Sequence, residues 1–364
     1  MISGLVHFYF DLNIALLAAF SIWLITRFSL RLIGYRFSFS AEQSLIFCFI
    51  GLAVLAPIVA RFAPMLLPTN FNITDWLVSW YLGGGVQMSA REFQTVISAK
   101  SSFIDQILHP NHVLSLIFAA LMGLAFTYFV VRLARSVFGL ASILRHSYVI
   151  HKNGRVHIVA SDQVSVPFTT LGLRHYYVVV PITMLSHSEQ MRIAIAHEIQ
   201  HIRHGDVAWE YIWSVLHPLL FWNPAFLMFR KRLNILRELI CDAALLQRTS
   251  FSKRRYCETL ISVARSMSTA RNSSSTLTVP FVEPKRHLAR RGQSNLEYRI
   301  LYALELPSAK RSIGLNSLGI FVPLVLATLF VVLLLQGPSE WSHDRIMLST
   351  IANLEHLESL NRGN

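Results

Sequence analysis

The sequence predicts a polytopic α-helical membrane protein with four spans and one α+β domain on the cytosolic side. Of its 364 residues, 53% are hydrophobic and only 15% are charged, which is too apolar for an ordinary soluble protein. Four stretches have the length and hydropathy of membrane-spanning helices. They are Leu5 to Thr26, Ser44 to Ala60, His112 to Val131 and Gly314 to Gln336.

The distribution of charge orients these spans. The net charge is +13, and the excess of Lys and Arg lies between Arg132 and Arg311, with a smaller basic segment between the first two spans. The remaining connections are neutral or acidic, so the positive-inside rule places the basic segments in the cytosol and both termini outside. Basicity therefore follows membrane topology. Because no nucleic-acid-reading motif accompanies it, direct nucleic-acid binding is not expected.

The spans divide the chain into six parts. In order, they are 1–60 (two spans and a basic cytosolic loop), 61–111 (an extracytoplasmic loop), 112–135 (the third span), 136–313 (the cytosolic domain), 314–336 (the fourth span) and 337–364 (a short extracytoplasmic tail).

The strongest chemical signal in the cytosolic part is His197-Glu198-x-x-His201. On a helix, two residues four apart share one face, so both imidazoles can bind one metal ion. Catalytic zinc needs three protein ligands and an open position, and Glu198 lies about 100° round the helix, where its carboxylate can act as general base. The motif predicts a zinc site with His197 and His201 as ligands and Glu198 as catalytic residue.

The third ligand must come from another segment. Metzincin-type sites have a third His six residues after the second, but Val207 occupies that position. Gluzincin-type sites use a Glu on a second helix, and Glu238 and Asp242 lie one turn apart on one predicted helix face. We expect Glu238 to bind zinc and Asp242 to accept a hydrogen bond from a ligand histidine, which makes the cytosolic domain a gluzincin-type zinc metallopeptidase with one zinc ion per chain. The alternative is that both carboxylates lie on the solvated face of a basic helix.

Short β-rich runs precede the histidine motif. Asn153-Gly154 separates two of them and predicts a hairpin. A further strand is expected at Tyr176 to Val180. We interpret it as a sheet edge with which the extended backbone of a peptide substrate pairs.

Between the two metal motifs lies the uncharged segment Tyr211 to Phe229, which contains two prolines. We expect a helical pair that packs against the spans or enters the inner leaflet. His217 within it is a candidate for stabilising the oxyanion of a tetrahedral intermediate, with a structural histidine as the alternative. Cys241, inside the second motif, is interpreted as a small buried hydrophobe rather than a ligand.

Together these features resemble the BlaR/MecR family of membrane sensor-transducer zinc metallopeptidases. The resemblance implies a bacterial cytoplasmic membrane protein in which His197, His201 and Glu238 bind zinc and Glu198 is the base, with Asp206 and Asp242 in the surrounding shell. It rests on the spans and on Pro167-Phe168-Thr169, His197-Glu198-x-x-His201 with Asp206, Phe221-Trp222-Asn223-Pro224 and Glu238-x-x-Cys241-Asp242.

The resemblance also implies partners. The substrate is expected to be a cytosolic transcriptional repressor of the BlaI/MecI type, the lipid bilayer is the second partner, and a homodimer is a candidate assembly. Self-cleavage is expected between about Ser273 and Ser294, where a polar segment meets Arg290-Arg291.

The chain departs from the family pattern after its last predicted span, where no penicillin-binding domain follows, so a β-lactam signal is not expected. Two other functions stay open. One is a membrane-protein quality-control protease similar to the HtpX and CAAX-protease group. The other is a non-hydrolysing, zinc-stabilised transducer, against which the intact Glu198 argues, because a structural site needs no base.

Overall fold

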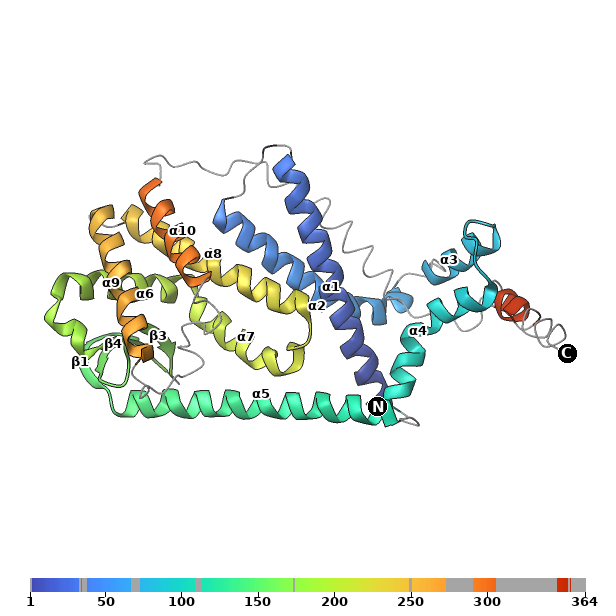
Figure 1. Ribbon diagram of the computed structural model, residues 1–364, viewed down its shortest axis with the longest axis horizontal. Helices are drawn as coiled ribbons and strands as arrows, with labels where there is room; N and C mark the ends of the chain where they lie inside the picture. Colours follow the sequence, from blue (N-terminus) through green and yellow to red (C-terminus); the bar gives the residue numbers. More distant parts are fainter. Residues whose placement is uncertain are drawn as a thin grey trace.

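The computed structural model describes residues 2–32, 34, 38–66, 73–108, 113–172, 174–248, 251–272, 291–305, 346–352 and 354. Within these ranges three helices have the length and hydropathy of membrane spans. They lie in α1 (Ile2–Leu32), α2 (Phe39–Leu66) and α5 (Val113–Arg145) and correspond to the first three predicted spans (Figure 1). The fourth predicted span, residues 314–336, lies outside the described ranges.

Helix α5 is longer than the predicted third span. The sequence ends that span at Val131 and starts the cytosolic domain at residue 136, but the helix continues to Arg145. Arg132 and Arg135 end the apolar run without ending the helix, because arginine is a good helix former. One helix therefore runs from the predicted membrane segment into the predicted cytosolic domain.

The predicted extracytoplasmic loop contains α3 (Ile73–Leu82) and α4 (Ala90–Leu108). Both pack with residues 346–352 of the predicted tail in a small apolar cluster of Val78, Ala90, Phe93, Leu348 and Ala352. Figure 1 shows this cluster at the opposite end of the molecule from the sheet. The two segments that the charge pattern places outside the membrane thus contact each other.

The strands β1 (Tyr148–Asn153), β2 (Val156–Ser161), β3 (Phe168–Leu171) and β4 (Tyr176–Pro181) form one sheet in the order β1-β2-β4-β3. β1 and β2 form the predicted hairpin, and Gly154 has the positive φ of 55° that its turn favours. β4 pairs in parallel with β2 and antiparallel with β3. The prediction of an edge strand at Tyr176 to Val180 is therefore wrong: β4 is central, and the two edge strands are β1 and β3.

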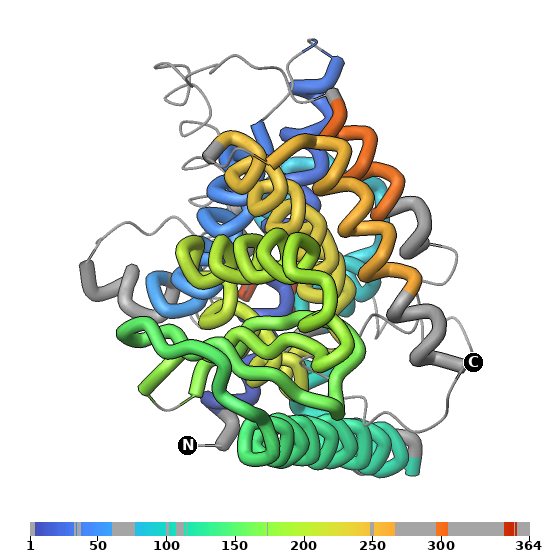
Figure 2. The backbone as a smooth tube through the Cα atoms, turned by 90° about the vertical axis from the view of Figure 1, so that its left-hand side faces the viewer, coloured from blue at the N-terminus to red at the C-terminus, as the bar shows by residue number. Residues whose placement is uncertain are grey.

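The two faces of the sheet are covered by different helices. Figure 2 shows the strands between α5 and α6 (Ser188–His204). Successive side chains of β4 alternate between these layers, which explains its unbroken apolar sequence. On one face Val159 and Val179 pack with Leu140 and Ile143 of α5, and on the other Val178 and Val180 pack with Ile195 and Ile202 of α6.

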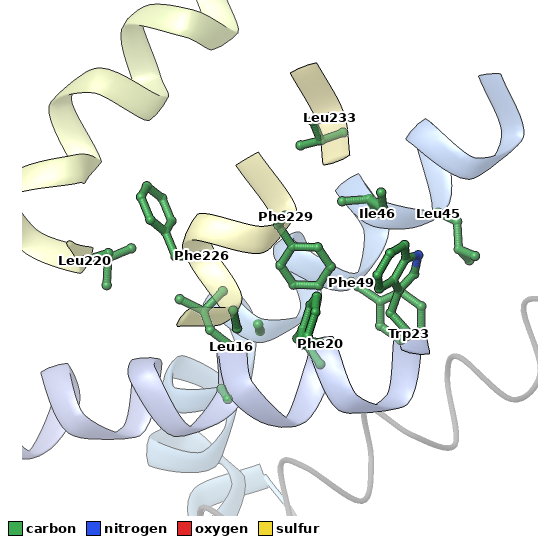
Figure 3. Close-up of a cluster of buried hydrophobic side chains, with 14 of the residues drawn as sticks. Leu16, Phe20, Trp23, Leu45, Ile46, Phe49, Leu220, Phe226, Phe229 and Leu233 are labelled. Carbon is green, nitrogen blue, oxygen red and sulfur yellow. The ribbon is translucent and has the colours of Figure 1, made fainter. Parts of the chain in front are cut away.

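Helix α6 follows the short 3-10 helix η1 (Ile182–Ser186), and α7 (Asp206–Leu220), α8 (Pro224–Arg248), α9 (Lys253–Asn272) and α10 (Arg291–Glu305) come after it. α7 and the start of α8 form the helical pair predicted for Tyr211 to Phe229. This pair packs against the apolar helices, with α7 beside α5 and α8 beside α1 and α2. The largest apolar cluster lies there (Figure 3), with Leu16, Phe20, Trp23, Ile46, Phe49, Phe226, Phe229 and Leu233 among its members.

The start of α8 is fixed within this cluster by a buried amide pair. The Asn223 side-chain amide donates to Asn13 Oδ1 at 2.8 Å, and Asn223 Oδ1 accepts from the backbone N–H of Ala225 at 3.0 Å. Asn223 therefore caps α8 and joins it to α1 at the same time. Such a pair is stable in an apolar environment because both buried amides find partners.

Candidate metal centre

The two motif histidines lie on one face of α6. Their ring centroids are 4.9 Å apart, as expected for residues separated by one helical turn. His197 is buried and His201 is partly buried. The local sequence thus presents two imidazoles side by side against the neighbouring helix α8.

Glu238 of α8 faces both rings. Its Oε2 lies 3.6 Å from His197 Nε2, and its Oε1 lies 3.9 Å from His201 Nε2. Ligand atoms from all three residues lie within 4.8 Å of one another. The structure thus brings together the three residues that the sequence predicts as metal ligands.

The outer nitrogen of each histidine faces a carboxylate. His201 Nδ1 lies 2.9 Å from Asp206 Oδ2, and His197 Nδ1 lies 3.4 Å from Asp242 Oδ1. Asp206 can reach back to α6 because Gly205, with φ of 72°, adopts a left-handed conformation between α6 and α7. Both Nε2 atoms are therefore left to face Glu238.

Asp242 is fully buried, and its carboxylate faces His197 and accepts hydrogen bonds from two other helices. The Tyr256 hydroxyl of α9 donates to Asp242 Oδ1 and also lies 3.3 Å from His197 Nδ1. Arg299 of α10 donates from Nε and Nη2 to the two Asp242 oxygens, each at 2.7 Å. Arg299 Nη1 further lies 2.8 Å from Glu238 Oε2. The cluster is thus assembled from α6, α8, α9 and α10.

The charges of this cluster shift two of its pKa values. Burial alone would raise the pKa of Glu238, but the Arg299 guanidinium, with His197 and His201, holds that pKa well below the ordinary 4.5. Burial alone would lower the pKa of His201, but hydrogen bonds with Asp206 and Cys241, together with the Glu238 charge, raise it well above 6.5. Without a metal ion, these shifts favour the anionic form of Glu238 and the cationic form of His201.

The predicted base Glu198 is held by the edge strand. Thr169 Oγ1 of β3 lies 2.8 Å from Glu198 Oε2, to which it donates, and 3.1 Å from the Glu198 carbonyl oxygen. The Thr169 hydroxyl thus binds one of the two carboxylate oxygens of Glu198 and orients its side chain. The edge strand of the sheet and the predicted base therefore adjoin.

The donor set fits a zinc ion. Two imidazole Nε2 atoms and one carboxylate form the three-ligand set of catalytic zinc sites, and each histidine has the carboxylate partner that fixes its tautomer and orientation. The ligand atoms are already close, and the separations of 3.6 and 3.9 Å leave room for an ion between them. His197, His201 and Glu238 are the residues that would hold it.

A second group of ligand atoms, from His201, Asp206 and Cys241, lies behind the first. Cys241 Sγ is 3.3 Å from His201 Nδ1 and 3.6 Å from Asp206 Oδ2. Burial raises the pKa of the Cys241 thiol to about 11, so the thiol stays protonated at neutral pH. This group shares His201 with the first one, and its contacts at His201 Nδ1 support the orientation of that ring.

The other predicted residues, His217, Arg290 and Arg291, have no described contact with this cluster or lie outside the described residues. The His217 ring packs against Phe129 of α5 and Phe226 of α8, with centroid distances of 4.7 and 6.3 Å. Its Nδ1 is buried without a hydrogen-bond partner in the described part of the chain. Arg290 lies outside the described residues, and Arg291 is the first residue of α10.

Three residues at the site were not predicted as its members: Thr169, Tyr256 and Arg299. Each comes from a different element and contributes one side chain, so no spacing pattern marks it. Pro167-Phe168-Thr169 stands out in the family resemblance, but only the sheet order shows that Thr169 lies beside Glu198.

The fold and this cluster define a chain with membrane-length helices and the donor set of a metallopeptidase. The chain belongs to the BlaR1 peptidase M56 family, whose model matches residues 8–293. The match confirms the resemblance to the BlaR/MecR family and identifies a membrane-associated metallopeptidase family. No match was found among curated proteins.

Proposed function

We propose that this chain is a zinc-dependent endopeptidase that transduces a signal across the bacterial cytoplasmic membrane by hydrolysing a cytosolic transcriptional repressor of the BlaI/MecI type. The observation that carries the proposal is that one helix, α8, belongs both to the apolar cluster of α1 and α2 and to the candidate metal centre. A protease that only needed a membrane anchor would not need to share a ligand helix with its spans.

Two features tie the first half of α8 to the apolar helices. Phe226, Phe229 and Leu233 are buried among side chains of α1 and α2. In the same stretch, Arg232 donates two hydrogen bonds to the buried carboxylate of Glu42 in the first turn of α2, at 2.8 and 2.6 Å. Glu238 follows within two turns of Arg232. A change in how α2 packs would therefore reach a metal ligand through one continuous helix.

The chemistry of hydrolysis follows from the residues around the cluster. Bound zinc would polarise the scissile carbonyl and make water a stronger nucleophile at neutral pH. Glu198 would accept a proton from the attacking water and pass it to the leaving amide nitrogen, while Thr169 keeps the carboxylate oriented. The edge strand β3 would pair with the extended substrate backbone, in the role that the sequence suggested for β4.

The proposed topology places the zinc domain in the cytosol and both termini outside. It is supported by the charge distribution and by the contact of α3 and α4 with residues 346–352. A chain that returns from a cytosolic domain to an outer cluster must cross the bilayer again, and residues 314–336 have the composition for that crossing. The segment 61–111 and the spans are the proposed receivers of an envelope signal.

The experiment compares cytosolic DNA-binding proteins in cells that carry the wild type or Glu198→Gln, with and without envelope stress. Glu198→Gln should keep the metal and lose cleavage, because it removes proton transfer without removing a ligand. Glu189→Gln, at an exposed carboxylate on the same helix, is the matched control and should behave as wild type.

One small repressor that is cut only when Glu198 is present would support the proposal. Damaged membrane proteins that accumulate in the Glu198→Gln cells would favour the quality-control protease. Equal signalling by wild type and Glu198→Gln would favour the non-hydrolysing transducer. Mass mapping of the chain itself from the same cells tests self-cleavage between about Ser273 and Ser294, near Arg290-Arg291.

A further inference from the structure

Helix α10 begins at Arg291 and runs past residue 293, where the family match ends, and its unmatched part reaches the metal centre. Its Arg299 makes three short ionic contacts: two to the oxygens of Asp242 and one to Glu238 Oε2. The Arg299 side chain is only 18% exposed. Arg299, which lies outside the matched region, therefore contacts the predicted ligand Glu238. It also contacts Asp242, the carboxylate that faces the predicted ligand His197.

The position of α10 is fixed by apolar packing and does not depend on Arg299 alone. Ala303 is fully buried beside Ile193 of α6, Leu245 of α8 and Tyr256 of α9. Lys253 Nζ also donates to the Leu304 carbonyl oxygen at 3.3 Å. Because the neighbouring turns are packed in this way, the guanidinium reaches the site from a defined backbone position.

The arrangement of the charges explains why an arginine is needed. Asp242 is fully buried, and a buried carboxylate is costly unless it is paired and hydrogen-bonded. The planar guanidinium satisfies both Asp242 oxygens and still has Nη1 for Glu238, whereas an ammonium group cannot reproduce this fork. In this geometry Asp242 is held at the outer nitrogen of His197, and Glu238 is held with Oε1 toward His201.

We propose that Arg299 is a positioning residue of the metal centre, which sets the orientation of Glu238 directly and that of His197 through Asp242. The inference rests on the proposed function, because it assumes that these residues bind zinc for hydrolysis. It makes α10 a part of the site.

The test measures zinc affinity of the purified full-length chain by competition with a chelating dye. Arg299→Ala and Arg299→Lys should weaken zinc binding by about 10- to 100-fold, with lysine retaining part of the affinity. The control is Arg230→Lys. Arg230 is 23% exposed, lies on α8 and pairs with Glu210 at 2.8 Å, but it does not contact the ligands or the carboxylates that face them. Arg230→Lys should bind zinc as the wild type does.

Two further measurements separate positioning from general stability. The thermal midpoint of the metal-free chain reports folding, and the visible spectrum of the cobalt-substituted chain reports the geometry of the ligands. We expect Arg299→Lys to change the cobalt spectrum, whereas Arg230→Lys leaves it unchanged. Wild-type zinc affinity and cobalt spectrum in folded Arg299→Lys would overturn the proposal. Failure of both Arg299 variants to fold would also overturn it, since Arg299 would then be required for the fold as a whole.

The outcome is distinguishable from failure of the proposed function. Zinc affinity and cobalt spectra need no substrate, so a chain that binds zinc through an Arg299-dependent site but cuts no protein would retain the inference and lose the peptidase proposal. Conversely, zinc-dependent cleavage that is unaffected by Arg299→Lys would retain the proposed function alone.

Discussion

His201 and His197 lie one turn apart on α6, and the Nδ1 atom of each faces a carboxylate. One of these carboxylates is close to its histidine in the sequence, and the other is far from it. Asp206 follows His201 after a single turn at Gly205, so the carboxylate on the His201 side of the site comes from contiguous sequence. The His197 side needs Asp242 from α8, which is held in turn by side chains of α9 and α10. The local side should tolerate disturbance of the surrounding helices, whereas the His197 side should not.

The largest effect on zinc binding is expected where the two sides meet. Glu238→Ala removes the carboxylate that faces both Nε2 atoms, so the purified chain should no longer hold about one zinc ion. Glu258→Ala, on the exposed face of α9, is the control and should retain the metal. Metal analysis after dialysis decides this, and full zinc occupancy in Glu238→Ala would mean that the third ligand lies elsewhere.

Asp242→Asn should have the next largest effect, because it disturbs the His197 side and leaves the Arg299 cation with a neutral partner. We expect a loss on the order of 3 kcal/mol in the free energy of unfolding of the metal-free chain. Zinc affinity should fall by about 100-fold. Chemical denaturation and dye competition measure the two quantities, and an unchanged denaturation midpoint would argue against a buried charge network.

Asp206→Asn should have a smaller effect than Asp242→Asn, which sharpens the comparison. It removes one charge from the His201 side, whose backbone stays in place because Gly205 and the α6–α7 turn are unaffected. Zinc affinity should fall by about tenfold and the fold should be retained. If Asp206→Asn is as disruptive as Asp242→Asn, the contrast between the two sides does not hold.

The raised pKa of His201 predicts that zinc uptake releases a proton at neutral pH, since only the neutral imidazole binds metal. Because the pKa of His201 is raised in the folded state, protonation of His201 stabilises the folded metal-free chain. This stabilisation is complete at pH values below the unfolded-state pKa of 6.5 and is lost as the pH rises through the folded-state pKa. The metal-free chain should therefore lose stability above neutral pH while zinc affinity increases. Calorimetry of zinc binding in buffers of different ionisation enthalpy measures the number of protons released. Asp206→Asn should reduce that number.

Tyr256→Phe should give the smallest effect. It removes only the hydroxyl that contacts Asp242 and His197, and Arg299 still satisfies both Asp242 oxygens. Zinc affinity should fall by about threefold, the magnitude of one neutral hydrogen bond. Zinc affinity is measured by dye competition. The reference is the matched variant Tyr298→Phe, at a half-exposed tyrosine of α10.

Periodic features of the site were predictable from the sequence. His197 and His201, and likewise Glu238 and Asp242, are one helical turn apart, and their spacing places each pair on one face. That pattern is sufficient to predict the ligand set that the structure brings together. The helical pair of Tyr211 to Phe229 was also predictable, because its lack of charge indicates burial and its two prolines interrupt a single helix.

Features that depend on the order of elements in space were not predictable. The run at Tyr176 to Val180 indicates a strand but not its place in the sheet, and its apolar residues on both faces are better explained by a central strand. Arg299 gives no signal because its partners lie on a helix more than fifty residues earlier in the chain. The contacts of His217 with Phe129 and Phe226 likewise depend on the packing of α5, α7 and α8, which the sequence does not show.

The continuity of α8 has a mechanical consequence. The helix contains no glycine, and its only proline is its first residue, so nothing within Pro224–Arg248 provides a hinge. About 14 Å of helix separate Phe229, packed between the spans, from Glu238. Helices at packed interfaces shift by about 1 to 2 Å in switching proteins, whereas metal–ligand distances vary by only about 0.2 Å. On the proposed function, a displacement of the apolar helices far smaller than the width of a side chain would be enough to disrupt the proposed zinc site at the other end of this helix segment.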